Sequence, residues 1–199
     1  HLAAQALVRP SYSFPLDTIT TNAIGSVNVL DVLRTLDKPV TAIMITSDKA
    51  YDNVEWLWGY REVDRLGGKD PYSASKGMAE LAIRSYVESF FNSPDSNVRI
   101  GIARAGNVIG GGDWAIDRIV PDSIKAWSRG EVVDIRSPDS TRPWQHVLEP
   151  LRGYLMLIEK QYENKTKLDY QEVYDVSIEQ KVRSNPKHYN LLMHKNLSR

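Results

Sequence analysis

A tyrosine and a lysine stand four positions apart in Tyr72-Ser-Ala-Ser-Lys76, which places both side chains on one face of a helix. A tyrosine that takes a proton from a substrate hydroxyl must be more acidic than a free phenol, whose pKa is about 10. A lysine about 4 Å away, at an effective dielectric constant of about 20, favours the phenolate by roughly 4 kcal/mol. The pair therefore predicts a general base with a pKa near neutrality. By spacing alone, an exposed surface pair is an equally good interpretation.

A serine, an aspartate and a second lysine follow the buried, β-rich run Val40-Thr-Ala-Ile-Met-Ile45. Ligands of parallel α/β proteins bind at the carboxyl ends of strands, so Ser47 is placed to steady a substrate oxygen. Asp48 and Lys49 add an acid and a candidate base. A polar turn or helix cap is the structural alternative for these residue types, and the Tyr72/Lys76 pair further along favours chemistry.

Lys49 has two possible roles. A lysine acts as a base only if burial or a neighbouring cation lowers its pKa. The alternative is that Lys49 adjusts the acidity of Asp48.

The elements that must position these side chains alternate between strand and helix. Apolar spacing predicts helices at 17–36, 71–91, 116–127 and 146–162, and strands at 40–45, 98–103 and 131–135. This alternation predicts an α/β fold with a parallel sheet and helices packed on it. His1-Leu-Ala-Ala-Gln5 is typical of a strand end that enters a loop, so the sequence starts within the alternation.

Composition excludes several classes of protein. The chain has 199 residues, with Lys plus Arg and Asp plus Glu each numbering 25, so a nucleic-acid or membrane-surface partner is not expected. No apolar run is long enough to span a bilayer. There is no cysteine, and the four histidines lack metal-ligand spacing, so we predict no metal. A cytoplasmic α/β domain is the expectation.

A glycine cluster imitates a dinucleotide-binding motif. Gly110-Gly-Gly112 with Ala115 fits a loose Gly-x-Gly-x-x-Ala pattern, and Asp134 follows about 20 residues on. That motif requires a strand immediately before it, and only Val108-Ile109 is available. We therefore interpret the cluster as a substrate loop.

Several long motifs in the right order closely resemble the CDP-glucose 4,6-dehydratase family, which belongs to the extended short-chain dehydrogenases/reductases. The resemblance covers roughly residues 1 to 162. Its motifs are His1-Leu-Ala-Ala-Gln5, Thr21-Asn22 with Gly25, Thr46-Ser-Asp-Lys-Ala-Tyr51, Asn53, Glu55-Trp56, Trp58-Gly-Tyr-Arg-Glu62, Asp70-Pro-Tyr-Ser-Ala-Ser-Lys-Gly77, Ala103-Arg-Ala-Gly-Asn-Val-Ile-Gly-Gly-Gly-Asp-Trp-Ala115 and Arg142-Pro-Trp-Gln-His-Val-Leu-Glu-Pro150.

The resemblance implies a role for each candidate site residue. Ser47, Tyr72 and Lys76 would form the catalytic triad, while Asp48 and Lys49 would carry out dehydration. Lys49 departs from the dTDP-glucose relatives, which have glutamate there. Other residues would bind ligands: Ala3, Ala4, Asn22, Ala105 and the Tyr72/Lys76 pair for NAD, and Asn107, Arg118 and Arg142 for the sugar diphosphate.

The fold that the resemblance implies is a partial Rossmann-type parallel sheet with helices on both faces and a small substrate-binding part. Residues 1–106 would be the carboxyl-terminal part of an NAD-binding domain without its Gly-rich start, and 107–163 a substrate-binding segment. Residues 164–199 would be a divergent, poorly ordered tail in which the resemblance ends.

The implied reaction is NAD-dependent dehydration of a nucleotide sugar, CDP-glucose first, to a 4-keto-6-deoxy sugar nucleotide. The complete protein would be a homo-oligomer, a dimer or tetramer, that supplies deoxysugars for surface polysaccharides such as the lipopolysaccharide O-antigen. Two alternatives stay open. One is a nucleotide-sugar epimerase or dehydrogenase of the same group, which would lack a reason for Asp48 and Lys49. The other is an inactive fragment that binds a partner.

Overall fold

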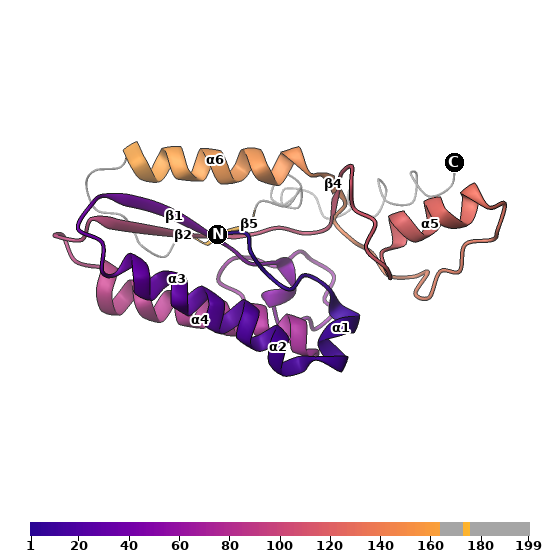
Figure 1. Ribbon diagram of the computed structural model, residues 1–199, viewed down its shortest axis with the longest axis horizontal. Helices are drawn as coiled ribbons and strands as arrows, with labels where there is room; N and C mark the ends of the chain where they lie inside the picture. The colour runs from indigo at the N-terminus through magenta and orange to yellow at the C-terminus, as the bar shows by residue number, and fades with distance from the viewer. Residues whose placement is uncertain (164–172, 176–199) are drawn as a thin grey trace.

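A parallel sheet with helices on both faces forms the main part of the protein, as the sequence predicts (Figure 1). The computed structural model describes residues 1–163 and 173–175. Strand order is β1-β2-β5, with both pairings parallel, and Val40 lies opposite Val98 in the first pairing. The strands are β1 Val40–Ile45, β2 Val98–Arg104 and β5 Val173–Asp175.

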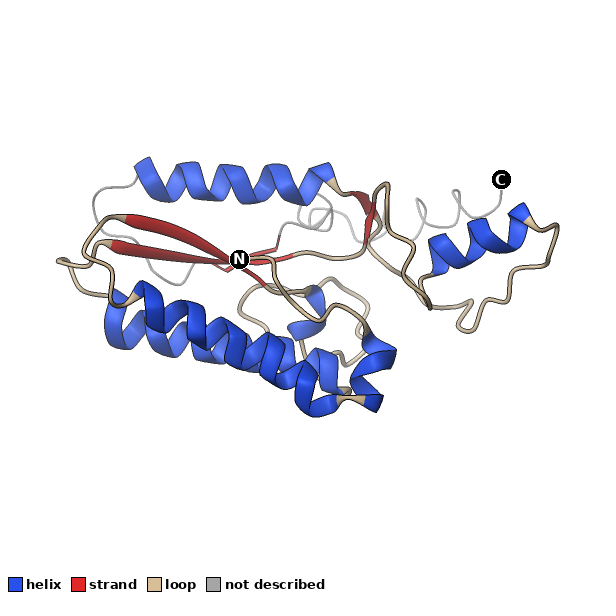
Figure 2. Ribbon diagram, viewed as in Figure 1, coloured by secondary structure: helices blue, strands red, loops and turns tan. Residues whose placement is uncertain are grey.

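Helices α3 and α4 cover one face of this sheet and α6 covers the other (Figures 1 and 2). Two π-helical segments, Thr20–Ile24 and Val87–Phe91, continue the helices at their ends. No helix within the described ranges is long and apolar enough to cross a membrane. The helices are α1 Val8–Ser13, α2 Pro15–Ile19, α3 Gly25–Leu33, α4 Pro71–Tyr86, α5 Ile119–Ser128 and α6 Leu148–Glu163.

Alternating side chains on β1 and β2 build two hydrophobic layers, because successive strand residues point to opposite faces. Met44 and Ile100 pack with Leu30 and Ile83 on the α3/α4 side. Ile43 belongs to the layer below α6. This double burial explains why residues 42–45 and 100–103 contain no polar side chain.

His1 lies beside β1, on the edge away from β2. Its amino group donates to the Ile43 carbonyl at 2.8 Å, and the Ile45 N–H donates to the His1 carbonyl at 3.1 Å. This is the bonding pattern of parallel strands. The expectation that residues 1–5 leave a strand end and enter a loop is confirmed.

A second, smaller sheet and α5 lie beyond the carboxyl ends of β1 and β2 (Figure 1). The two short strands are β3 Val108–Ile109 and β4 Gln145–His146, which pair in parallel. This part holds most of the range expected to bind substrate. That range also ends in α6, which instead packs on the sheet through Tyr154 and Leu157.

The expectation of a strand at 131–135 is wrong. These residues form no strand, since Val132 is 96% exposed and no strand of the described residues pairs with this segment. Conversely, β5 lies within the range expected to be a divergent tail, and it pairs with β2. The rest of the tail, including His188 and His194, lies outside the described residues.

A helix cap, a proline and a hydrogen bond to a distant serine fix the start of α4. The Asp70 side chain caps the helix by accepting the Ser73 N–H at 2.9 Å, and Pro71 occupies the first turn, where no N–H is needed. The buried Ser11 hydroxyl accepts the Tyr72 N–H at 3.2 Å. Together these contacts fix where Tyr72 lies.

The Gly68→Ala substitution should destabilise the fold. A Cβ at Gly68 would lie 2.3 Å from the Ala74 backbone nitrogen, so the loop or the first turn of α4 must move. We expect the free energy of unfolding to fall by about 1–3 kcal/mol in urea titrations. Gly111→Ala is the control, since nothing lies within 4 Å of its Cβ. Equal stability of both variants would contradict the close approach.

Candidate active site

Ser47 and Asp48 lie side by side just after the carboxyl end of β1. Ser47 caps a short 3-10 turn, Asp48–Ala50, and accepts the Lys49 N–H at 3.3 Å. The Ser47 hydroxyl donates to Asp48 Oδ1 at 2.8 Å. The Asp48 N–H donates to the Ala105 carbonyl at 3.1 Å, which ties this turn to the segment after β2.

Tyr72 and Lys76 reach the same place from α4. Both are buried, at 8% and 6% exposure, although one is a phenol and the other a cation. A hydrogen bond joins the side chains of Tyr72 and Ser47. The structure therefore brings Tyr72, Ser47 and Asp48 together, with Lys76 one helical turn along.

The electrostatics of Tyr72 differ from the sequence-based prediction. Burial raises the pKa of Tyr72 above its usual value, and the Asp48 charge raises it further, while the Ser47 hydrogen bond and the Arg118 charge lower it. Lys76 has no resolved effect on it. Burial also lowers the pKa of Lys76 itself. The prediction of a Lys76-driven pKa near neutrality is therefore wrong, because burial raises the Tyr72 pKa and Lys76 is not among the groups that lower it.

The surroundings of Asp48 favour its protonated form. Burial raises the pKa of Asp48, and this effect exceeds the opposing contributions. The Ser47 hydrogen bond, the charge and backbone N–H of Lys49, and the Arg142 charge all lower it. A carboxyl with a raised pKa keeps its proton to higher pH, as a general acid requires. The second role considered for Lys49, control of Asp48 acidity, matches these contacts.

Sequence reasoning missed a buried ionic cluster behind the site. Glu80, one turn beyond Lys76, accepts the Thr46 hydroxyl at 2.6 Å and the Arg104 Nε at 2.7 Å. A second Arg104 nitrogen donates to the other Glu80 oxygen. Arg104 also lies 4.3 Å from the centre of the Tyr51 ring. A glutamate four residues after a lysine is also typical of exposed helices, so the sequence pattern gave no signal of burial.

Asn22 serves mainly to position neighbouring backbone. Its amide donates to the Gln5 carbonyl at 3.0 Å and to the Ser75 hydroxyl at 2.8 Å, and its oxygen accepts the Gln5 N–H. The expected cofactor residues Ala3 and Ala4 precede Gln5, in the segment that Asn22 fixes. Ala3 is exposed and Ala4 half-buried.

The three residues expected to bind the sugar diphosphate lie in the segment between β2 and α6. Arg118 donates to the Ala6 carbonyl at 3.3 Å, while its buried Nε has no partner among the described residues. Arg142 is exposed and acts on Asp48 through its charge. Asn107 accepts the Gln145 N–H through its backbone carbonyl.

The glycine cluster lacks the context of a dinucleotide-binding motif. Gly110, Gly111 and Gly112 are exposed after the two-residue strand β3, and the next helix starts only at Ile119. This placement agrees with the substrate-loop interpretation. No three metal-ligating side chains gather in the described part of the chain.

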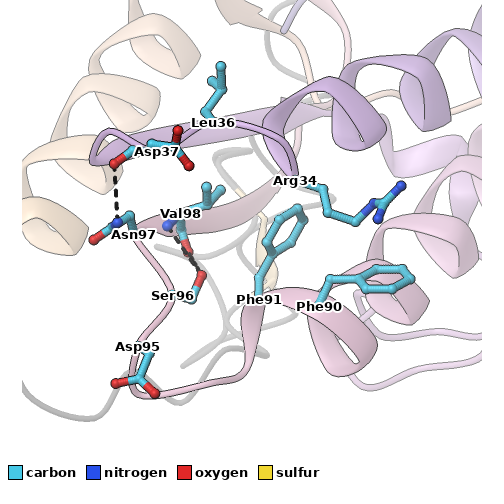
Figure 3. A pocket seen from close by; sticks show the side chains of 9 residues that line it. All are labelled: Arg34, Leu36, Asp37, Phe90, Phe91, Asp95, Ser96, Asn97 and Val98. Carbon is cyan, nitrogen blue, oxygen red and sulfur yellow. Dashed lines mark hydrogen bonds between the residues drawn. The ribbon is translucent and has the colours of Figure 1, made fainter.

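A shallow depression of about 240 Å³ lies away from this site, at the amino ends of the strands (Figure 3). Arg34, Phe91 and Asn97 help to line it. None of the candidate site residues belongs to it.

The architecture and the buried Ser47, Tyr72 and Lys76 cluster define a Rossmann-type short-chain dehydrogenase/reductase arrangement. The family model described as GDP-mannose 4,6 dehydratase matches residues 1–195, so the chain belongs to that family. The match extends past Glu163, further than the sequence motifs suggested.

Three known proteins illustrate the relationship. A CDP-glucose 4,6-dehydratase of Salmonella typhimurium is 50% identical over 165 residues, which cover 81% of this chain and 46% of that protein. The structure of a dTDP-glucose 4,6-dehydratase from Streptomyces venezuelae, with NAD and TYD bound, has 19% identity and a TM-score of 0.73, covering 94% of this chain and 55% of that one.

A UDP-glucuronic acid 4-epimerase from Bacillus cereus, in complex with UDP-glucuronic acid and NAD, has 22% identity and a TM-score of 0.73. That match covers 89% of this chain and 52% of the epimerase chain. The two structures share the fold of this chain. The chain spans about half the length of the relatives it matches.

Removing the Arg118 charge should make Tyr72 harder to ionise. Because the Arg118 charge lowers the pKa of Tyr72, Arg118→Gln should move the Tyr72 titration midpoint to higher pH. Arg142→Gln is the control, because the Arg142 charge lowers the pKa of Asp48 and has no resolved effect on the pKa of Tyr72. NMR of ring-labelled tyrosine, assigned with Tyr72→Phe, gives both midpoints. Equal midpoints in the two variants would disprove this assignment.

Proposed function

We propose that the protein carrying this chain is an NAD-dependent nucleotide-sugar 4,6-dehydratase that acts on CDP-glucose. The observation that carries the proposal is the shared environment of Ser47, Asp48 and Tyr72, in which an acid with a raised pKa lies beside a phenol and a hydroxyl. The 50% identity to a CDP-glucose 4,6-dehydratase supports the choice of substrate.

The donor set at this edge fits NAD. Ala3 and Ala4 place small side chains in the segment beside β1, and the Lys76 ammonium and Tyr72 hydroxyl can donate to ribose oxygens. When bound, NAD would supply the hydride acceptor for carbon 4 of the sugar and the hydride donor for carbon 6. By the family resemblance, Ala105 would lie near the nicotinamide, and its carbonyl accepts the Asp48 N–H.

Tyr72 acts first. Its phenolate, which the Arg118 charge favours against the effect of burial, takes the proton of the carbon-4 hydroxyl. The Ser47 hydroxyl then donates to this oxygen in place of Asp48 Oδ1. The ketone that forms at carbon 4 acidifies the hydrogen on carbon 5.

Asp48 then gives its proton to the carbon-6 hydroxyl, which leaves as water, while a base removes the carbon-5 proton. The same base returns that proton to carbon 5 when hydride reaches carbon 6. Lys49 is the sequence-based candidate for that base, and its contacts with Asp48 support the second role, control of the acid. Dehydration separates this function from epimerisation or simple oxidation, neither of which needs Asp48.

Arg118, Arg142 and Asn107 would hold the sugar diphosphate. The buried Nε of Arg118, which has no partner in residues 1–163 or 173–175, supports this role, because guanidinium groups bind phosphate oxygens through paired N–H donors. In this scheme residues 1–106 belong to the NAD-binding domain and 107–163 hold the substrate-binding segment, apart from α6, which packs on the main sheet. The cytoplasmic dimer or tetramer and the supply of surface-polysaccharide sugars rest on the family resemblance alone.

Asp48→Asn should uncouple oxidation from elimination. Asparagine keeps the shape of the side chain but cannot give a proton to the leaving hydroxyl, so elimination should slow by about 10²–10⁴-fold. Reduced cofactor should then accumulate in absorbance measurements, and mass spectrometry should show little loss of water. The control is Asp95→Asn, an exposed aspartate beside the distant depression. Unchanged rates of both steps in Asp48→Asn would refute the acid role.

Lys49 variants should distinguish charge from base chemistry. The Lys49 charge lowers the pKa of Asp48, so Lys49→Gln should raise this pKa. The activity that needs protonated Asp48 falls as pH rises through that pKa, so the alkaline limb should move to higher pH. Lys49→Arg keeps the charge and should leave the limb in place, as pH–rate profiles can show. Loss of elimination in both variants would instead identify Lys49 as the carbon-5 base.

A further inference from the structure

The Glu80 carboxylate is fully buried and accepts hydrogen bonds on both of its oxygens. Oε1 accepts from the Thr46 hydroxyl at 2.6 Å and from Arg104 Nε at 2.7 Å. Oε2 accepts from Arg104 and lies 3.8 Å from Arg84, whose side chain is 41% exposed. Three partners therefore fix the orientation of one carboxylate: Thr46 directly after β1, Arg104 in β2 and Arg84 in α4.

The Thr46 contact connects this carboxylate to the reactive turn. Thr46 immediately precedes Ser47 and Asp48, and its own N–H donates to the Ala103 carbonyl at 2.9 Å. Its hydroxyl bond to Glu80 holds the end of β1 against α4, the helix that carries Tyr72. The separation between Ser47 and Tyr72 therefore depends on where Glu80 lies.

The Glu80 charge also acts on Lys76. The two residues are four positions apart on α4, so they share a face of the helix. Burial lowers the pKa of Lys76, and Glu80 is the one described group with a resolved opposing effect. No such effect comes from the charged residues on the elements packed against α4, namely Arg9, Asp17, Asp31, Asp48, Lys49 and Glu88.

We infer that Glu80 is a positioning residue, which sets the Ser47–Tyr72 geometry through Thr46 and supplies the negative charge that faces the Lys76 ammonium. It touches no reacting atom. Its importance for catalysis rests on the proposed function. Its effects on the Ser47–Tyr72 geometry and on the charge of Lys76 can be measured without turnover.

The charge effect is tested by titrating Lys76 in the folded chain. NMR of lysine labelled at Cε, assigned with Lys76→Arg, gives the midpoint. In Glu80→Gln the midpoint should fall by about one pH unit, a tenfold change in the ratio of charged to neutral lysine. Arg84→Gln, which removes only the exposed partner of Glu80, should leave the midpoint unchanged.

Glu80→Gln leaves Arg104 buried without its counter-ion and can therefore fail to fold. Glu80→Asp keeps the charge but withdraws it by one methylene, so the Lys76 midpoint should fall by a smaller amount. If the Lys76 midpoint is unchanged in a variant that folds, whether Glu80→Gln or Glu80→Asp, the charge role is overturned.

The geometric effect is tested at Thr46. Thr46→Val removes the hydroxyl that bonds to Glu80, while Thr46→Ser keeps it. The Ser47 hydrogen bond lowers the pKa of Tyr72, so displacement of the turn in Thr46→Val should raise the Tyr72 midpoint. Thr46→Ser should match the unmodified chain. Equal Tyr72 midpoints in both variants overturn the positioning role.

The inference about Glu80 and the proposed function can be disproved independently of each other. If the protein binds NAD and CDP-glucose but releases no water, the dehydratase proposal falls and the titration results stand. If dehydration is observed and the Lys76 and Tyr72 midpoints do not move, the inference about Glu80 falls and the dehydratase proposal stands.

Discussion

A carboxylate and a guanidinium buried together, as Glu80 and Arg104 are, each lose several kcal/mol of hydration. Their mutual attraction offsets this loss only when the remaining hydrogen-bonding capacity is satisfied. Here the Thr46 hydroxyl, the Glu62 carbonyl and the Tyr51 ring supply the further contacts. Because removal of either partner would leave an uncompensated buried charge, the pair ties α4 to the end of β2. The exposed ion pair of Arg9 with Asp117 has no comparable effect, since surface pairs contribute about 0–1 kcal/mol.

The remaining polar contacts continue outward from that pair. Asn22 joins Gln5 to Ser75, and the Ser11 hydroxyl holds the Tyr72 N–H. Each bond connects segments that are distant in the sequence, and each involves a buried or part-buried side chain. A buried polar group without a partner costs about 1–3 kcal/mol, so these bonds restrict the arrangement of the backbone around the site. The site residues therefore come from separate elements but occupy one fixed arrangement.

The sequence was sufficient for features that depend on local spacing. Strands 40–45 and 98–103, the helix at Tyr72 and the position of Ser47 at a strand end all follow from periodicity, and the structure confirms them. Features that depend on distant partners did not follow. The run at 131–135 has strand-like residues but no neighbour, and β5 pairs with β2 far away in the sequence. The pKa of Tyr72 was misjudged for the same reason, because desolvation depends on everything packed around the ring and not on Lys76 alone.

The protonation states of the site depend on two parts of the molecule at once. Asp48 lies in the turn after β1, and Tyr72 lies in α4. Arg142 lowers the pKa of Asp48 and Arg118 lowers that of Tyr72, and both arginines lie in the segment beyond the sheet. Under the proposed function, a diphosphate held by these arginines would cancel part of their charge. The pKa of Asp48 would then rise, which favours its role as an acid. The pKa of Tyr72 would rise as well, so the Ser47 hydrogen bond becomes the main remaining contact that favours the phenolate, and the distance between Ser47 and Tyr72 gains importance once substrate is bound.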